Sequence, residues 1–204
     1  MLAHGSLLLV GGAGLLPDMI FPRRMDPLPL TTERLSIRLL REDDLDGLHR
    51  IYGDPEAMRY VGSTGRARSR DQTARNLTRF IADREKHGYG LWATDLRASG
   101  EMIGMCGLIP VEGAGPDVEV VYVLEQPAWG KGYATEMARA CLEAGFGPFG
   151  LERVIALAYP ENGPSVRVMQ KAGMRSAGTM HAHGHDLVCY EAFADRGSDS
   201  RPSR

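Results

Sequence analysis

Hydrophobic and polar positions follow two periods along the chain, and each period predicts one kind of element. Residues 34–40 alternate hydrophobic with polar side chains, which predicts a β-strand. Residues 41–54 place hydrophobic side chains at helical spacing behind an acidic start. Residues 69–88 repeat the helical spacing and end on a glycine, which suits the C-terminus of a helix.

The second half of the chain alternates strands with helices. The hydrophobic runs predict strands at 90–96, 102–111, 117–124, 152–159, 175–181 and 186–193, and helices at 130–146 and 164–173. The resulting order, β-α-α-β-β-β-α-β-α-β-β, predicts one mixed sheet flanked by helices, an α/β domain. A chain of 204 residues is long enough for one such domain with a real hydrophobic core.

Net charge and cysteine usage limit the classes of partner and the compartment that we expect for this protein. The 24 Lys+Arg nearly balance the 26 Asp+Glu, so the net charge of -2 offers no basic field for nucleic acid or an anionic membrane. A small-molecule or protein substrate is expected instead. Cys106, Cys141 and Cys189 are far apart and odd in number, which indicates buried thiols of a reducing cytoplasm rather than disulfides or zinc ligands.

Both ends of the chain differ from its middle. The apolar run in residues 6–16 lacks the positive flank of a secretory signal and is too short to span a bilayer. Pro17 and Pro22 break the helix that a dinucleotide-binding turn would need there. We expect residues 1–27 to be a poorly ordered extension, with Met25 as the functional start, 28–194 to be the domain, and the polar residues 195–204 to be a disordered tail.

A glycine-rich turn between a strand and a helix is the first candidate site. The predicted strand 117–124 leads by a short loop into Gly130, Lys131 and Gly132 at the start of a helix. The unpaired amides and positive dipole end of that helix would suit a phosphate or pyrophosphate, and glycines let backbone approach it. A solvated helix entry is the alternative. Gly132 excludes a Walker loop, and Thr135 departs from the dinucleotide fingerprint.

Three ordered motifs resemble those of the GNAT superfamily of acyl-CoA-dependent N-acetyltransferases, and more closely its ribosomal-protein (RimJ/RimL-like) branch. They are PLTTERLSIRLLREDDLDGLHRIYGDPEAMRYV at 29–61, VEVVYVLEQPAWGKGYATEMARA at 118–140 and ALAYPENGPSVRVMQKAGM at 156–174. The resemblance extends over about residues 30–193. It implies a single GNAT-type domain with a twisted, mostly antiparallel sheet of about seven strands and about four helices.

The resemblance also implies where acetyl-CoA, the co-substrate, would bind. In that superfamily the loop amides hold the pyrophosphate, and a strand splayed from its neighbour binds pantetheine and the acetyl carbonyl. Carried onto this sequence, the binding residues are Val121, Tyr122, Val123, Trp129, Gly130, Lys131, Gly132, Tyr133, Ala134 and Thr135, with Asn162 and Ser165. Two positions depart from the family pattern: Val121 stands where glycine is usual, and Met169 stands where a thiol-protonating tyrosine is common.

Acetyl transfer to an amine requires a base, an oxyanion donor and a proton for the departing thiolate. Glu119 is the predicted base. Period-two alternation places it on one face of its strand with Val121 and Val123, opposite Tyr122. Because a carboxylate in water is a weak base, we expect Glu119 to act through water or with a pKa raised by burial. A solvated edge residue is the structural alternative.

Asn162 and Ser165 carry two compatible interpretations. Asn162 before Pro164 is a good helix N-cap. The family match implies instead that Asn162 contacts pantetheine or orders a water, and that Ser165 hydrogen-bonds or protonates the CoA sulfur.

A histidine triplet and an arginine cluster are the remaining candidates. His181, His183 and His185 alternate as metal ligands on a strand would, but Gly184 predicts a hairpin turn inside the triplet, so we expect no metal. The arginines Arg66, Arg68, Arg70 and Arg75 form a solvated loop or favour an acidic or phosphorylated acceptor.

The predicted function is acetyl transfer from acetyl-CoA to a primary amine of a small molecule or protein N-terminus, by direct attack in a ternary complex. The fold cannot assign the acceptor. A non-catalytic acyl-CoA-binding sensor is the main alternative, favoured by Val121 and the missing tyrosine, and a nucleotide-binding interaction module is a third. We expect a cytoplasmic monomer or homodimer that binds neither nucleic acid nor membrane.

Overall fold

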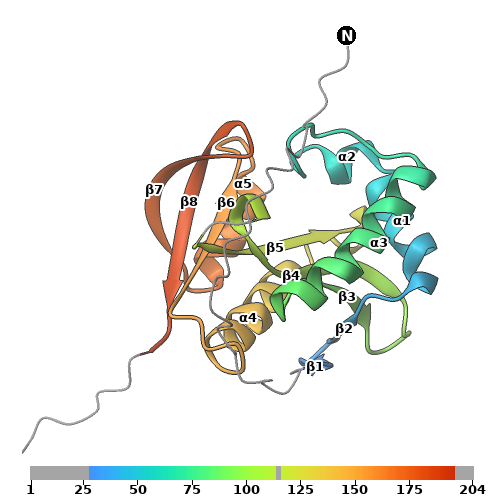
Figure 1. Cartoon of the computed structure of the whole chain (residues 1–204), viewed down its shortest axis with the longest axis horizontal. Coiled ribbons are helices and arrows are strands. Elements are labelled where there is room, and N and C mark those ends of the chain that lie inside the picture. The colour runs from blue at the N-terminus through green and yellow to red at the C-terminus, as the bar shows by residue number, and fades with distance from the viewer. Residues whose placement is uncertain (1–27, 114–115, 196–204) are drawn as a thin grey trace, which may run out of the picture.

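One eight-stranded sheet organises the chain (Figure 1). A computed structural model describes residues 28–113 and 116–195. The strands are β1 (Leu30–Thr31), β2 (Leu35–Leu39), β3 (Leu91–Leu96), β4 (Met102–Pro110), β5 (Val118–Leu124), β6 (Arg153–Ala158), β7 (Arg175–Ala182) and β8 (His185–Phe193). They lie in the order β1-β2-β3-β4-β5-β6-β8-β7. Every neighbouring pair is antiparallel except β5 and β6, which run parallel.

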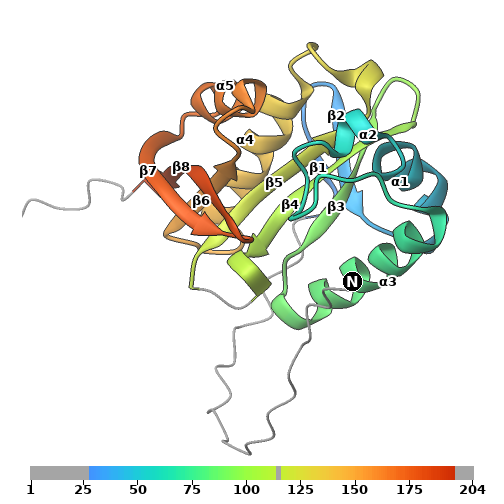
Figure 2. The ribbon, with the colours of Figure 1, turned by 90° about the horizontal axis from the view of Figure 1, so that it is seen from above.

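Helices cover both faces of this sheet (Figures 1 and 2). They are α1 (Leu45–Tyr52), α2 (Pro55–Met58), α3 (Arg70–His87), α4 (Tyr133–Phe146) and α5 (Gly163–Lys171). The first three helices pack on one face, and α4 and α5 pack on the other. The domain therefore has three layers, with the sheet in the middle.

Local capping chemistry sets the ends of the longest helix, α3. The Ser69 side chain accepts a hydrogen bond from the Gln72 N–H, and the Gln72 side chain accepts one from the Ser69 N–H. This reciprocal arrangement satisfies two amides that the helix itself cannot pair. At the other end, Gly88 adopts the left-handed conformation (φ 76°) that the sequence predicts for this C-cap.

Two hydrophobic clusters hold the layers together. Trp92, Met137 and Met169 lie in the cluster between the sheet and α4–α5, while Leu48 and Met58 lie in the cluster beneath α1–α3. Burying one large apolar side chain of this kind stabilises the fold by roughly 1.5–3 kcal/mol. Packing on both faces therefore holds the central strands of the sheet in place.

All predicted strands and helices are present, and the predicted fold class is confirmed. The sheet has eight strands rather than about seven, because β1 adds a two-residue pair in which Leu30 opposes Ile37. The four-residue helix α2 was not predicted, since one turn is too short to show a period; it is capped by the Asp54 side chain. The three cysteines are buried and free, as predicted.

The predicted extension 1–27 and nearly all of the predicted tail 195–204 lie outside the described residues, so the domain boundaries stay predictions. Among the helices that the structure describes, none is both long and apolar enough to cross a bilayer.

Candidate functional site

The sheet opens between its two parallel strands. β5 pairs with β4 over its whole length, from Val118 to Leu124, but shares only one register pair with β6, between Glu119 and Ile155. Beyond Glu119 the two strands separate. Along the described strands, the β5 edge at Val121–Val123 therefore presents amide and carbonyl groups to the opening instead of to a neighbouring strand.

The glycine-rich turn lies directly beyond the end of β5. A short 3₁₀ turn (Gln126–Ala128) leads to Gly130 and Gly132, whose φ angles are 74° and 85°. Only glycine adopts this left-handed conformation without strain, which explains both glycines. Gly132 is the N-cap of α4, and no side chain of the described residues caps that end. The first amides of α4 therefore lack a side-chain cap among the described residues, which is the arrangement an anion site would need.

Two hydrogen bonds, one local and one long-range, hold this turn in place. An Arg34 NH group donates to the Lys131 carbonyl (2.8 Å), and the Trp129 indole N–H donates to the Leu124 carbonyl (2.9 Å) although 44% of Trp129 is exposed. Arg34 also forms an ion pair with Glu136 (2.7 Å) in the first turns of α4. These contacts fix the backbone of the turn while leaving its glycine faces open.

Glu136 receives several hydrogen bonds that its position in the sequence did not reveal. Its carboxylate accepts from the Arg34 backbone N–H (2.9 Å), the Arg34 guanidinium (2.8 Å) and the Thr32 hydroxyl. Burial alone would raise the pKa of Glu136, but these bonds and the Arg34 charge hold it below its usual value. Sequence reasoning missed Arg34 and Glu136 because they are separated by 102 residues.

Glu119 lies at the point where the opening begins. Its residue exposure is 6%, so it is a buried carboxylate rather than the solvated edge residue of the structural alternative. The predicted alternation is confirmed, because Tyr122 packs toward α4 and Val121 and Val123 pack toward α1–α3. Its hydrogen-bond partner in the described chain is the imidazole of His183, with Nε2 3.4 Å from Glu119 Oε2.

Asn162 and Ser165 start α5 on the other side of the opening. The Asn162 side chain accepts a hydrogen bond from the Ser165 N–H (3.2 Å), which confirms its role as N-cap. The Ser165 hydroxyl lies 2.9 Å from the Tyr122 hydroxyl. Burial, the largest influence, raises the pKa of Tyr122 to about 12, so its hydroxyl keeps its proton at neutral pH. No pattern in the sequence indicates this pair of hydroxyls.

The two departures from the family pattern have different structural roles. Met169 is 1% exposed and packs in the α4–α5 cluster, so it completes the core and offers no proton donor. Val121 is half-buried on the Glu119 face and contacts the cluster beneath α1–α3.

The histidine triplet is divided by a hairpin turn, as predicted. His183 and Gly184 form the two-residue turn between β7 and β8, both with positive φ. His181 Nδ1 lies 2.7 Å from Asp186, His183 faces Glu119, and His185 Nε2 lies 3.1 Å from the Ser63 carbonyl. The three rings thus have different partners, and the described residues contain no group of three metal-ligating side chains.

The predicted arginine cluster is dispersed. Arg68 lies over the Tyr52 ring and Arg70 pairs with Asp46, whereas Arg66 and Arg75 are exposed. The four side chains do not converge on one ligand.

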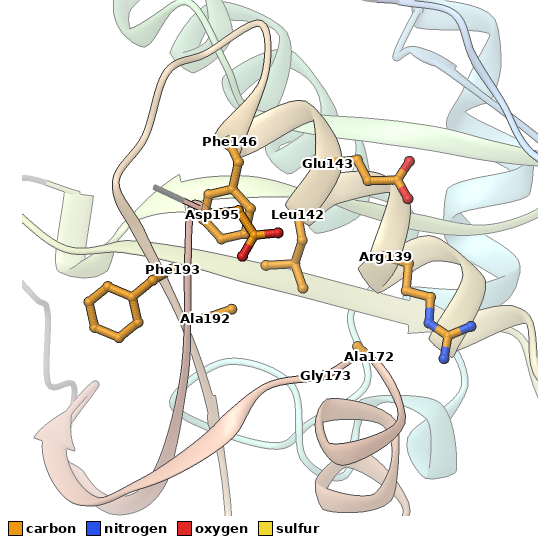
Figure 3. Close-up of a pocket in the computed structure, with 9 residues that line it drawn as sticks. All are labelled: Arg139, Leu142, Glu143, Phe146, Ala172, Gly173, Ala192, Phe193 and Asp195. Carbon is orange, nitrogen blue, oxygen red and sulfur yellow. The ribbon is translucent and has the colours of Figure 1, made fainter. Parts of the chain in front are cut away.

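A separate hollow of about 360 Å³ opens between α4, the end of α5 and the end of β8 (Figure 3). It is lined by Arg139, Leu142, Glu143, Phe146, Ala172, Gly173, Ala192, Phe193 and Asp195. None of these is a predicted site residue. The candidate site is therefore the opening in the sheet, where Val121–Val123 are half-buried, and not this hollow.

Known proteins share this combination of sequence and fold. A family profile described as an acetyltransferase (GNAT) domain matches residues 34–175. The uncharacterized protein YkkB of Bacillus subtilis (strain 168) is 33% identical over 169 residues, which cover 79% of this chain and 94% of YkkB. The uncharacterized N-acetyltransferase YnaD of the same organism is 33% identical over 149 residues, covering 73% of this chain and 84% of YnaD.

Solved structures agree. A GNAT-family acetyltransferase from Bacillus anthracis has a TM-score of 0.69 and 26% identity, covering 80% of this chain and 97% of its own. RimL, a ribosomal L7/L12 alpha-N-protein acetyltransferase solved with coenzyme A, has the same TM-score at 17% identity, covering 82% of this chain and 98% of its own, which shows the fold alone. On the family profile and these relatives, the chain belongs to the GNAT family of acetyltransferases.

Proposed function

We propose that this protein transfers an acetyl group from acetyl-CoA to a primary amine by direct attack in a ternary complex. The observation that carries the proposal is the opening between β5 and β6, which begins at a buried carboxylate, Glu119. Acetyl-CoA would enter from the α4–α5 side and place its thioester in this opening. The amine would approach the thioester from the α1–α3 side.

The α4–α5 side suits the coenzyme. We assign the pyrophosphate to the free amides of the turn from Trp129 to Thr135, where the helix dipole is positive. Pantetheine would pair with the unpaired β5 edge at Val121–Val123, close to Asn162 and Ser165. GNAT relatives solved with coenzyme A, such as RimL, support this class of co-substrate.

The chemistry follows from which groups face the opening. Glu119, directly or through a water, takes a proton from the acceptor ammonium, and the neutral nitrogen attacks the thioester carbon. The cationic nitrogen of the adduct then loses its second proton to water. A backbone N–H of Val121–Val123 meets the oxyanion. As the C–S bond breaks, the CoA thiolate takes a proton from the Ser165 hydroxyl. Ser165 regains a proton from Tyr122, and Tyr122 regains one from solvent. This hydroxyl pair fills the role that Met169 cannot.

The acceptor class we propose is a primary amine of a small molecule or of a protein N-terminus. Glu119 is the acidic group beside the entrance on the α1–α3 side, which favours an ammonium over an acidic group at the reacting end. A branch assignment to ribosomal-protein acetyltransferases is part of this proposal, as is a location in the reducing cytoplasm, which three free buried thiols support.

Calorimetric titration with acetyl-CoA, with ATP and NAD as controls, is the first test. CoA thiol release is then measured with a panel of a dipeptide, amino acids, polyamines and an aminoglycoside. We expect one-to-one binding of acetyl-CoA alone and turnover of at least one amine.

A matched pair of variants then tests the base. Glu119→Gln should lower kcat by about 10²-fold or more without changing acetyl-CoA affinity, since a general base contributes about 10²–10⁴-fold. Glu143→Gln, the same change at an exposed position on α4, should not. Binding without turnover of any amine would identify a sensor, and absence of acetyl-CoA binding would refute the proposal.

A further inference from the structure

His183 occupies the tip of the β7–β8 hairpin, and its imidazole faces the buried Glu119. The two side chains come from elements 64 residues apart, with Nε2 3.4 Å from Oε2. The His183 side chain is 34% exposed, whereas that of Glu119 is 8% exposed. The imidazole therefore connects the carboxylate to solvent.

The hairpin tip is held on both sides of His183. The His183 N–H donates to Glu112 Oε1 (2.9 Å), and the next histidine, His185, contacts the Ser63 carbonyl (3.1 Å). These contacts tie the tip to the segment before β5 and to the loop after α2. The imidazole is thus positioned against Glu119 by neighbours that are not themselves part of the proposed reaction.

Backbone preference alone does not select histidine at this turn. His183 has φ 55°, and two-residue hairpin turns of this kind favour asparagine, aspartate or glycine at the first position. In the described residues only one other non-glycine residue has a positive φ, and it is Glu112, the partner of the His183 N–H. Histidine is among the residues enriched at positive φ, and here its side chain also contacts Glu119.

Resting on the proposed role of Glu119 as base, we propose that His183 carries the proton from Glu119 to solvent. In each cycle Glu119 takes one proton from the acceptor ammonium and must release it before the next. Neutral His183 accepts that proton at Nε2, which restores the carboxylate, and the imidazolium then gives one proton to water. His183 acts through Glu119 and does not contact the substrate, so it is a positioning and proton-carrying residue.

The charges around His183 determine the expected pH dependence. Glu119 faces it from β5, and Glu112 faces it from the 3₁₀ turn Val111–Gly113. The hydrogen bond to Glu119 is the main cause that raises the pKa of His183 above 6.5, against burial, which lowers it. Above the raised pKa the ring is neutral and can accept a proton. Below it the ring is already protonated, so kcat should fall on the acidic side.

The test uses His183→Asn with His181→Asn as its matched control. Asparagine suits the left-handed turn, so this variant should fold, but it cannot carry a proton. His181 lies on the same hairpin and contacts Asp186 instead of Glu119. With the panel amine that turns over fastest, His183→Asn should lower kcat by about 10-fold, less than loss of the base itself. It should leave acetyl-CoA affinity unchanged and lose the acidic limb of the kcat profile.

Two further readouts separate proton transfer from a merely structural effect. Added imidazole buffer should restore kcat of a His183→Ala enzyme, which has room for the ring, and should not affect His181→Asn. By NMR titration of the free protein, Glu119→Gln should lower the pKa of His183.

The proposal is overturned by full activity of His183→Asn across the pH range, by absence of imidazole rescue, or by an unchanged His183 titration in Glu119→Gln. If the wild-type protein acetylated no amine, the proposed function would have failed. The NMR titration would still decide whether Glu119 and His183 act as a pair.

Discussion

The hydroxyl oxygens of Tyr122 and Ser165 lie 2.9 Å apart and join β5 to α5 across the opening of the sheet. The Tyr122 hydroxyl also donates to the Ser165 carbonyl oxygen at 3.2 Å. Burial keeps the Tyr122 hydroxyl protonated, so the pair can supply one proton at neutral pH. In the proposed reaction this pair supplies the proton that a tyrosine at position 169 would supply in the family pattern.

Ser165→Ala should lower kcat by about 10-fold without abolishing turnover, since an alcohol is a modest acid and water can substitute for it. Tyr122→Phe should cost less, because Ser165 then keeps its hydroxyl. CoA thiol release measures both rates, with Ser176→Ala, exposed on β7, as the control. A fully active Ser165→Ala enzyme would assign thiol protonation to water.

Gly132→Glu and Gly132→Ala separate backbone strain from charge at the glycine-rich turn. Both variants must adopt φ 85° with a Cβ, which costs about 1–2 kcal/mol. Only glutamate also places a negative charge at the proposed phosphate site. Acetyl-CoA affinity by calorimetry should therefore fall much further for Gly132→Glu than for Gly132→Ala. Equal affinities in the two variants would mean that the pyrophosphate does not bind at this turn.

Glu136→Gln should destabilise the fold in a pH-dependent way. Losing a charged acceptor of several bonds in this part-buried site should cost about 1–3 kcal/mol in the free energy of unfolding at neutral pH. Because the folded pKa of Glu136 lies below 4.5, its stabilising contribution is complete above pH 4.5 and is lost as the pH falls through the folded value.

Urea unfolding of wild type and Glu136→Gln at several pH values measures this difference. The gap between the two free energies of unfolding should shrink below pH 4.5. A gap that is constant with pH would mean that the Glu136 charge does not contribute.

Arg38→Ala should be the most destabilising of these substitutions. Arg38 pairs with Asp44 (2.8 Å) and Asp95 (2.6 Å), and these carboxylates are only 5% and 12% exposed. Removing the arginine leaves two buried carboxylates without their cation, which costs about 3–5 kcal/mol. Arg41→Ala is the control: its side chain is 65% exposed and 3.7 Å from Asp44, so its effect should stay within about 0.5 kcal/mol. Similar losses in both variants would contradict the role given to Arg38.

Local patterns in the sequence determined most of the elements of this protein. The alternation in residues 34–40 and 117–124 and the capping residues Ser69 and Gly88 act over a few positions, so they can be interpreted without the fold. The same holds for the face of β5 that carries Glu119 and for the glycines that open α4. The family motifs pointed to acetyl-CoA as the proposed co-substrate, because GNAT relatives that share the fold bind coenzyme A.

Only the tertiary structure decided which of these residues meet. The strand edge at Val121–Val123 is free because β5 leaves β6 after a single register pair, and no local pattern encodes that separation. Arg34 reaches Glu136 across 102 residues, and His183 reaches Glu119 across 64. Such contacts follow from how the layers pack, whereas periodicity and capping report only on neighbours along the chain.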